Sequence, residues 1–498
     1  MMAFIAIGDL GSNSFRLGIS KNIDGQYQVV DSLKEMIHFA AGLDENDNLD
    51  IVSQKRALEC LERFGERLRG FKKNQVRIVA TNTFRVAKNI EDFLPKAEAA
   101  LKFPIEIIGG YEEARLIYKG VIHTLRSKEK KILVVDIGGG STEFIVGTGS
   151  YPEIAESLPM GCVSYSKTFF SHENITQKHF KEAIHMARST LQELRQEIAQ
   201  TRWQLAIASS GTAKTIHALA MVKQPDCRGF NYDFLIHLKD QIVQYGNVEK
   251  AKLKEVKNSR SSVFAGGLAI MIAIFEELNI QYIEATEASL RDGVLYEFIG
   301  RQLDQDLRNE TVNTFQNRYH VDSKQANRVT TIASVFFQSF IQKKLPDQEL
   351  TNWKQFLIWA AQLHEVGIFI SHASYQKHSA YILEHADMPG FSRTEQQILS
   401  RLIGAHRGDL KRLPLLANAP EPLWYAVLAL RLATIFCRSR NPLTLPQNAS
   451  LTYKKKSKAI VLHISKTWMR ANPLTKSILE TEALAWRQID YHFSVKLT

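Results

Sequence analysis

The sequence predicts an α/β protein in which two similar α/β halves are followed by an all-α region and a small C-terminal β element. The first observation is a pattern of strand, aspartate, small-residue turn and strand, which occurs at residues 4–19 and again at 132–146. The second is a change near residue 300, beyond which apolar residues follow a helical period. The third is strand-like alternation at residues 459–464 and 491–497.

Each repeated unit places an aspartate and a turn of small residues at the end of an apolar strand. Asp9 precedes residues 11–14, and Asp136 precedes residues 138–142. Such turns expose backbone N–H groups that can wrap an anion, and the aspartate can face a metal ion. One copy alone would fit an ordinary hairpin equally well, but the duplication favours two half-domains facing each other across a cleft. No G-x-x-x-x-G-K-[ST] string occurs, and residues 15–19 alternate as a strand, which argues against a P-loop.

The chain between the two turns predicts a helix at residues 51–71 and a strand at 75–80, with Arg85 just beyond the strand. An arginine above a strand end can hold a phosphate through two hydrogen bonds. By residue statistics alone, a single arginine is more often an ordinary surface residue.

A short strand at residues 104–108 is followed by two glycines and a helix that opens with Glu112 and Glu113. The helix dipole stabilises acidic residues in a first turn, so favourable surface charge is the ordinary interpretation. The alternative is that one of the two carboxylates points into the cleft and acts as general base on a water molecule.

The second half predicts a helix at residues 177–200 and then a strand that ends in a small-residue turn at Gly211 and Thr212. Because this turn starts another helix, it is a further candidate contact for an anion. A buried helix is expected at 264–278, and a strand and turn at 283–293 close this half.

Beyond residue 300 the pattern predicts helices at residues 333–341, 353–363, 378–385, 394–403 and 423–437. Histidines gather in this region and would suit a metal site: His364, His372, His378, His385 and His406. The pair His364 and Glu365 lacks the second histidine of an H-E-x-x-H motif, however. Ordinary core or surface histidines are therefore the favoured interpretation.

Composition is that of a globular protein, with 45% hydrophobic and 23% charged residues. The net charge of +11 favours polyanionic partners without choosing among them. The 4 cysteines form no C-x-x-C pair, which favours a reducing, cytoplasmic setting. No basic segment precedes the first strand, so no signal peptide is expected, and the apolar run at 264–275 is about half a membrane span. No integral membrane segment is therefore expected.

Motifs along nearly the whole chain resemble the exopolyphosphatase and guanosine pentaphosphate phosphohydrolase family. The segments that carry this resemblance are residues 9–16, 80–85, 108–116, 135–143, 160–163 and 210–212, and, in the last third, 363–367, 377–382 and 388–391. The resemblance implies two RNase H-like halves of the actin-like, sugar-kinase-like ATPase type, followed by a helical domain related to the HD phosphohydrolases. It also implies Mg²⁺-dependent hydrolysis of a terminal phosphoanhydride, with release of orthophosphate, by a homodimer.

The resemblance also implies roles for individual residues. Glu113 would be the catalytic glutamate and Arg85 the phosphate-binding arginine, while Asp9, Asp136 and Glu143 would lie at the metal. The phosphate-binding set, which includes the further turn residues noted above, comprises Gly11, Ser12, Asn13, Ser14, Gly138, Gly139, Gly140, Ser141, Thr142, Gly211 and Thr212.

The substrate and the division of the chain remain expectations. Processive hydrolysis of inorganic polyphosphate is the first hypothesis, and conversion of guanosine pentaphosphate to the tetraphosphate is the alternative. A polyphosphate-binding scaffold or a kinase is a rival of another class. The expected domains are residues 1–125 and 126–300 for the two halves, 301–445 for the helical domain and 446–498 for the C-terminal element.

The sequence departs from the family pattern at two places, and it contains one basic segment of interest. Glu365 follows His364 where an active HD domain has aspartate, which places a separate metal site there in doubt. Residues 108–111 read Ile-Gly-Gly-Tyr where Ile-Ser-Gly is expected. Residues 401–412 are a candidate path for polyphosphate, although a solvated helix end is the simpler interpretation. No nucleic acid partner is expected, and peripheral attachment to the inner membrane is an alternative to a purely cytoplasmic location.

Overall fold

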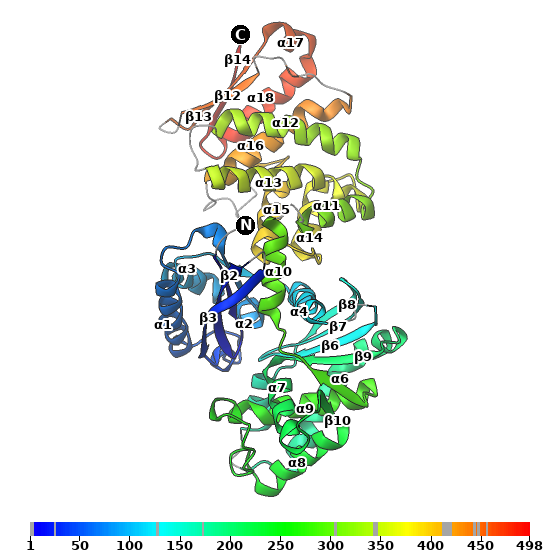
Figure 1. The fold of residues 1–498 in the computed structure, drawn as a ribbon. Helices are drawn as coiled ribbons and strands as arrows, with labels where there is room; N and C mark the ends of the chain where they lie inside the picture. The colour runs from blue at the N-terminus through cyan, green and yellow to red at the C-terminus, as the bar shows by residue number, and fades with distance from the viewer. Residues whose placement is uncertain are drawn as a thin grey trace. The chain divides into compact units, whose positions relative to one another are not determined.

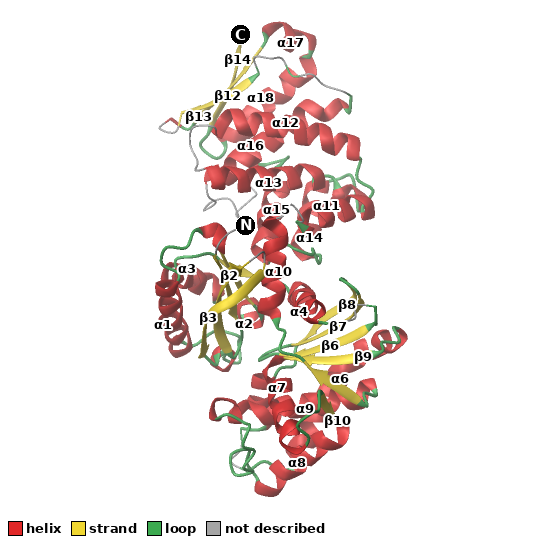
Figure 2. Ribbon diagram, in the orientation of Figure 1, coloured by secondary structure: helices red, strands yellow, loops and turns green. Residues whose placement is uncertain are grey.

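The computed structural model describes residues 4–23, 26–125, 129–171, 174–302, 306–341, 347–410, 421–441, 445, 449–454 and 457–498. The chain forms two compact units, Met1–Asp306 and Leu307–Thr498. Figures 1 and 2 show that the first unit contains two sheets with helices around them and that the second is mostly helical.

The first sheet has the strand order β3-β2-β1-β4-β5. Strand β1 pairs antiparallel with β2 and parallel with β4, so the first predicted hairpin is confirmed. The strands are β1 (Phe4–Leu10), β2 (Ser14–Ile23), β3 (Gln26–Met36), β4 (Val76–Ala80) and β5 (Ile105–Ile107). The helices that accompany them are α1 (Ile51–Arg67), α2 (Asn82–Val86), α3 (Ile90–Leu101) and α4 (Gly110–Thr124).

The second sheet repeats this arrangement in the order β10-β11-β9-β6-β7-β8. Strand β6 pairs antiparallel with β7 and parallel with β9, as β1 does with β2 and β4. The strands are β6 (Ile132–Ile137), β7 (Thr142–Thr148), β8 (Tyr151–Leu158), β9 (Leu205–Ser209), β10 (Gly229–Asn231) and β11 (Tyr282–Ala285). The helices are α5 (Cys162–Phe169), α6 (Gln177–Gln200), α7 (Ser210–Lys223), α8 (Tyr232–Tyr245), α9 (Asn258–Leu278) and α10 (Leu290–Gln302).

Helices α4 and α10 lie between the two sheets (Figure 2). Successive side chains of a strand point to opposite faces, so Ile5 and Ile7 of β1 and Val134 of β6 turn toward this middle layer. There they pack in one cluster with Leu116 of α4 and Val294 of α10. The helix that carries Glu113 is therefore held by both halves of the unit.

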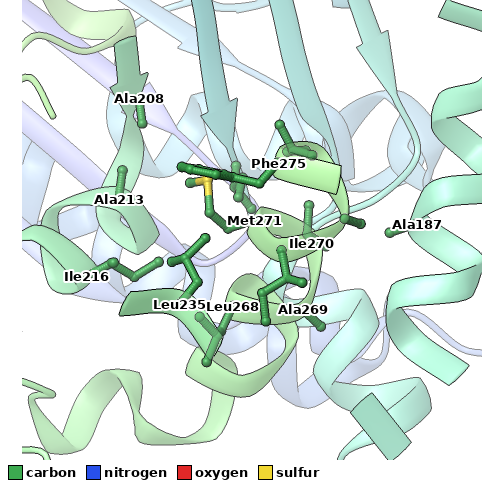
Figure 3. Close-up of a cluster of buried hydrophobic side chains, with 14 of the residues drawn as sticks. Ala187, Ala208, Ala213, Ile216, Leu235, Leu268, Ala269, Ile270, Met271 and Phe275 are labelled. Carbon is green, nitrogen blue, oxygen red and sulfur yellow. The ribbon is translucent and has the colours of Figure 1, made fainter. Parts of the chain in front are cut away.

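Helix α9 fills the core on the other face of the second sheet (Figure 3). Its apolar side chains, among them Leu268, Ile270, Met271 and Phe275, contact residues from α7 and α8. Of the described helices, it alone is long and apolar enough to cross a membrane, but 78% of its apolar window is buried. Burial to this extent is typical of a helix in a protein core.

The second unit is a helical layer with a small three-stranded sheet of order β12-β13-β14. One cluster of buried residues joins the helices to this sheet. The helices are α11 (Leu307–Arg318), α12 (Ser323–Ile341), α13 (Asp347–Leu363), α14 (Tyr375–His385), α15 (Arg393–Ala405), α16 (Glu421–Phe436), α17 (Lys466–Ala471) and α18 (Pro473–Arg487). The strands are β12 (Ser450–Lys454), β13 (Ala459–Ile464) and β14 (His492–Leu497).

Two differences from the sequence expectation concern the ends of the units. The turn expected at Asp292 and Gly293 is wrong, because both residues lie inside helix α10. Strand β12 and helices α17 and α18 were not predicted, whereas β13 and β14 lie where alternation predicts strands.

Lys411 and Arg412 of the basic segment at residues 401–412 lie outside the described residues.

The closest helix approach in the middle layer is expected to require glycine. A methyl group at Gly293 of α10 would collide with the carbonyl oxygen of Leu116, and one at Gly120 of α4 would lie 2.6 Å from the carbonyl oxygen of Ser289. We therefore expect Gly293→Ala to destabilise the protein by about 2 kcal/mol or more, as overpacking does. Thermal unfolding followed by circular dichroism measures this loss.

Gly404 of α15 is the control, because its added methyl group would meet only the Cβ of Ala380, at 3.5 Å. Gly404→Ala should be neutral or stabilising by up to about 1 kcal/mol, since alanine favours a helix. Equal unfolding temperatures for the two variants would contradict the packing of α4 on α10.

Candidate functional site

The two small-residue turns touch each other at the ends of β1 and β6. A methyl group at Gly139 would lie 2.8 Å from the Cβ of Ser12 and 3.2 Å from the amide nitrogen of Asn13. One at Gly140 would collide with the side-chain oxygen of Asn82. Glycine is therefore required here by close approach of the two halves, and the duplicated turns form one site.

Helix α5 holds the second turn from behind. The amides of Cys162 and Val163, in the first turn of the helix, each donate to a turn carbonyl, of Gly138 and Gly139 respectively, at 2.9 Å. A methyl group at Gly161 would collide with the same turn. Because the carbonyls of the second turn point to helix α5, the amides of that turn point to the side away from the helix.

Not every turn amide is available to a ligand. The amide of Gly11 donates to the carbonyl of Ser14 at 3.2 Å, and that of Gly138 donates to the carbonyl of Ser141 at 2.8 Å. These two bonds close the turns, so a phosphate-binding role for the Gly11 and Gly138 amides is not supported. In the described part of the chain, no acceptor is found for the other turn amides, those of Ser12, Asn13, Gly139, Gly140 and Ser141.

A cavity of about 130 Å³ lies between the turns. Most of the predicted site residues line it: Asp9, Gly11, Ser12, Asn13, Ser14, Glu113, Asp136, Gly138, Gly139, Ser141 and Gly211. This volume suits one phosphoryl group with its surrounding water rather than a whole nucleotide.

Five predicted residues lie close to the cavity but not on its wall: Arg85, Gly140, Thr142, Glu143 and Thr212. The Thr142 hydroxyl donates to the carbonyl of Met160 at 2.5 Å, and Thr212 is buried against Gly267. Glu143 is also buried and accepts a 2.8 Å hydrogen bond from Ser157. The side chains of Thr142, Glu143 and Thr212 therefore support the wall of the cavity.

Arg85 is directed to Glu113 instead of the cavity. Its Nη1 atom donates to Glu113 Oε2 at 2.6 Å and to the carbonyl of Ile108 at 2.9 Å. The arginine therefore orients the glutamate side chain at the first turn of α4.

Gly110 lies at the helix start, where the motif departs from the family pattern. A methyl group added at Gly110 would lie 2.7 Å from the Cβ of Ser157.

Four carboxylates share this small region. Burial raises the pKa of Asp9, Asp136, Glu113 and Glu143 above their usual values. Mutual repulsion adds to this effect, since Asp9 and Asp136 raise the pKa of Glu113 while Arg85 lowers it. A carboxylate with a raised pKa is a stronger base once it is ionised, which suits Glu113 for proton abstraction.

A divalent cation fits this arrangement. Asp9 and Asp136 both line the cavity, and their like charges raise the pKa of the Asp136 carboxyl. Mg²⁺ is commonly bound through one or two carboxylates together with phosphate oxygens and water. No group of three or more histidine, cysteine, aspartate or glutamate side chains suited to a metal is found among the described residues.

Sequence reasoning missed a set of basic residues at one side of the cavity, here called the cationic cluster: Arg16, Lys34, Lys257, Arg260 and Arg291. Arg16 and Arg260 line the cavity, and the Arg260 guanidinium lies directly over Gly211. Burial, followed by the four neighbouring cations, lowers the pKa of Lys34 to about 8. Arg16 pairs in register with Asp9, so the hairpin pattern could have located it. Arg260 and Arg291 reach the site only through the tertiary fold.

An ion-pair network holds α4 on α10. Arg115 donates to both carboxylate oxygens of Glu112, at 2.7 and 2.9 Å, and lies 3.3 Å from Glu297. Lys119 lies 2.7 Å from the same Glu297 oxygen. Although burial opposes it, the attraction of Arg115 and Lys119 holds the pKa of Glu297 well below its usual value. This network therefore fixes the helix that carries Glu113.

Removing one charge of that network should be costly. Glu297→Gln leaves Arg115 with one partner fewer in a buried position, so we expect a loss of about 3 kcal/mol in the free energy of unfolding. The control is Glu182→Gln, which removes an exposed pair with Lys178 at 3.8 Å and should cost under about 0.5 kcal/mol. Similar unfolding curves for both variants would show that the network contributes no more than a surface pair.

Removing a carboxylate of the cavity region should stabilise the protein, in contrast to Glu297→Gln. Because the pKa of Glu143 is raised in the folded protein, its ionisation costs stability at neutral pH, and Glu143→Gln should stabilise by about 1 kcal/mol or more, given about 1.4 kcal/mol per pKa step. Below about pH 4 the carboxyl is protonated in both states, so the gain should vanish. Unfolding without added metal or phosphate at pH 4 and pH 8 measures this; destabilisation at pH 8 would contradict it.

Comparisons with known proteins agree with this geometry. Residues 18–302 match the Ppx/GppA phosphatase family, and residues 307–483 match domain III of the Ppx/GppA phosphatases. A protein of Pseudoalteromonas translucida (strain TAC 125), named guanosine-5'-triphosphate,3'-diphosphate pyrophosphatase, is 36% identical over 491 residues, which are 97% of each chain.

Solved structures resemble about three fifths of the chain. An exopolyphosphatase from Cytophaga hutchinsonii has a TM-score of 0.55 over 60% of this chain and 98% of its own, at 21% identity, which is a likeness of fold alone. An Aquifex aeolicus member of the Ppx/GppA family has a TM-score of 0.50 over 60% of this chain and 98% of its own, at 25% identity. The predicted α/β, actin-like fold with a C-terminal helical part is thereby confirmed. The chain belongs to the Ppx/GppA phosphatase family, and it is a phosphoanhydride hydrolase.

Proposed function

We propose that the chain hydrolyses the terminal phosphoanhydride of guanosine pentaphosphate, releasing orthophosphate and leaving the tetraphosphate. The observation that carries this proposal is the cationic cluster beside the cavity between the turns. The cavity suits one phosphoryl group, and the cluster offers further positive charge to other phosphates of the same substrate. The relative of 36% identity is named for a substrate with a triphosphate and a separate diphosphate. Such a substrate would use both the cavity and the cationic cluster.

The terminal phosphoryl group would lie between the turns. Amides of Ser12, Asn13, Gly139, Gly140 and Ser141 would donate to its oxygens, which disperses the charge that develops during in-line displacement. Amide donors of this kind are fixed before the substrate arrives, so they cost no reorganisation during the reaction.

Glu113 would act as the general base. It lines the cavity, and its carboxylate would take a proton from a water molecule as the water oxygen bonds to the terminal phosphorus. The bond from that phosphorus to the bridging oxygen breaks, and the bridging oxygen leaves with the remaining substrate. Arg85 would act through Glu113 by holding its carboxylate in position, not as a direct phosphate ligand.

Mg²⁺ is the cofactor that we propose for this site. Asp9 and Asp136 would hold it, and when bound it would offset the negative charge of the phosphates and of the buried carboxylates. Glu143, which bonds Ser157 and lies off the cavity wall, would act on the electrostatics of the site rather than as a direct ligand.

Inorganic polyphosphate is the second candidate substrate, because the same cationic cluster could bind successive phosphates of a linear chain. The rate constant kcat/KM for guanosine pentaphosphate and for long-chain polyphosphate, measured on one purified sample with Mg²⁺, separates the two. A higher value for guanosine pentaphosphate supports the first proposal, and a higher value for polyphosphate overturns it. Loss of ATP that depends on an acceptor, without orthophosphate release, would instead indicate a kinase.

A homodimer is a prediction from the resemblance, a cytoplasmic location is a prediction from the cysteine pattern, and peripheral attachment to a membrane is also a prediction. Light scattering of the purified chain would test the dimer, since a monomeric mass at micromolar concentration would contradict it. Co-sedimentation with vesicles of anionic lipid would test attachment to a membrane surface.

Replacing the base should stop turnover without preventing binding. We expect Glu113→Gln to lower kcat by about 10²- to 10⁴-fold, because general-base catalysis contributes that much, while the substrate Kd changes little. The control is Glu91→Gln on the exposed first turn of α3, which should keep full activity. More than a tenth of wild-type kcat in Glu113→Gln would exclude Glu113 as the base.

The cationic cluster should give binding a distinctive pH dependence. Because the pKa of Lys34 is lowered to about 8, its charge is present below that pH and lost above it. We therefore expect KM for guanosine pentaphosphate to rise several-fold between about pH 7 and pH 9 in the wild type. Lys34→Arg keeps its charge in this range and should flatten the rise. The control, Lys250→Arg at an exposed position, should keep the wild-type profile; identical profiles for all three proteins would remove Lys34 from the site.

A further inference from the structure

The helical unit contains a second and larger cavity that the proposed reaction does not use. Its volume is about 750 Å³, which is within the range of pockets for small organic ligands. It is lined by residues from the start of α14, the end of α15, α16 and α18, and every lining residue belongs to this one unit.

Two of the arginines on its wall are neutralised by carboxylates. Arg431 donates to both oxygens of Glu482, at 2.5 and 2.8 Å, and also to the carbonyls of Ala405 and Gly408. Arg440 lies 2.5 Å from Glu365, so these two guanidinium groups are committed to the fold. Their role is to hold the end of α15 and the segment before α14 in place.

Two further arginines on the same wall have no carboxylate partner in the described part of the chain. Arg407 lies over the ring of Tyr375, with its guanidinium carbon 4.6 Å from the ring centre, and Arg438 is exposed at the end of α16. Guanidinium groups with unused donors bind phosphate and carboxylate groups well, because their planar donors match two oxygens at once. This wall therefore suits an anionic group.

Two buried histidines add hydrogen-bond acceptors. The Nδ1 atoms of His364 and His406 lie 2.7 and 2.5 Å from the carbonyls of Ala361 and Ile403, so each ring carries its hydrogen on Nδ1 when neutral. Burial lowers the pKa of both rings. The Nε2 atom of His406 accepts from the Tyr375 hydroxyl at 3.3 Å, whereas among described residues that of His364 has no hydrogen-bond donor. His364 thus offers an acceptor to an N–H or O–H group.

Apolar side chains of α16 and α18 form one part of the remaining wall, which also includes the polar residues Gln325, His372, Asp409, Thr434, Thr481 and Gln488. Ile435 of α16 and Ile478, Leu484 and Ala485 of α18 line it, and the Leu484 side chain is 58% exposed. A pocket with a partly apolar wall, unpaired guanidinium groups and a directed acceptor matches a ligand that has a flat ring, N–H or hydroxyl donors and a phosphate.

We propose that this cavity is a nucleotide-binding site separate from the catalytic cleft. The phosphate binds Arg407 and Arg438, the base lies against the apolar wall formed by α16 and α18, and a donor of the base or ribose bonds His364 Nε2. The proposal is independent of the substrate of the catalytic cleft, because no residue of the first unit contributes to it.

The test is hydrogen–deuterium exchange of the full chain carrying Glu113→Gln, which prevents turnover, with GTP and ATP as probes. We expect at least one of the nucleotides to slow exchange in peptides covering residues 364–375 and 431–440, apart from any effect at residues 9–14 and 136–142. The double variant Arg407→Ala and Arg438→Ala should raise the Kd for this protection at least tenfold and leave exchange in the catalytic peptides as before. Arg470→Ala, at an exposed arginine of α17, is the control and should not change it.

Two results would overturn the proposal. One is the absence of protection at residues 364–375 and 431–440 with both nucleotides at millimolar concentration. The other is equal protection by inorganic tripolyphosphate at the same concentration, which would show that the cavity binds phosphate chains without recognising a base. Should the double variant fold poorly, the single variants Arg407→Gln and Arg438→Gln test the same phosphate contacts.

Discussion

The repulsion among four carboxylates, of which Glu113 and Glu143 are buried and Asp9 and Asp136 partly buried, is the constraint on which the rest of the first unit depends. Asp9, Asp136, Glu113 and Glu143 come from four different elements, and burial raises the pKa of each. Left alone, such a group would destabilise the fold, since buried charges are costly unless they are paired. We propose that the protein retains it because the same negative field would bind a cation and would strengthen Glu113 as a base. Stability is thus reduced at the point where chemistry occurs.

Neighbouring side chains hold three of these carboxylates in place against the repulsion. Arg85 bonds Glu113, Ser157 bonds Glu143, and Arg16 lies beside Asp9 in the hairpin. Helix α4 is packed between two sheets and joined to α10 by charged side chains. The residues of the cationic cluster also repel one another, and a polyphosphorylated substrate would relieve that repulsion.

Local patterns in the sequence predict much of this arrangement but not its contacts. The two hairpins follow from period-two alternation and from glycine turns, both of which are set by neighbouring residues. The position of Glu113 in the first turn of a helix is equally typical of surface charge, and only the family resemblance singled it out as the catalytic glutamate. The orientation of Arg85 toward Glu113 and the approach of Arg260 to Gly211 depend on packing between distant segments. Asp292 and Gly293 looked like a turn because glycine usually interrupts a helix, yet here glycine permits α10 to approach α4. A single sequence cannot show that difference.

The central claim is that a water molecule activated by Glu113 attacks the terminal phosphorus of the substrate. Hydrolysis of guanosine pentaphosphate in ¹⁸O-labelled water, with mass spectrometry of both products, tests it directly. The account predicts one ¹⁸O atom in the released orthophosphate and none in the tetraphosphate. Label in the new terminal phosphate of the tetraphosphate would place the attack at the neighbouring phosphorus and would contradict the account.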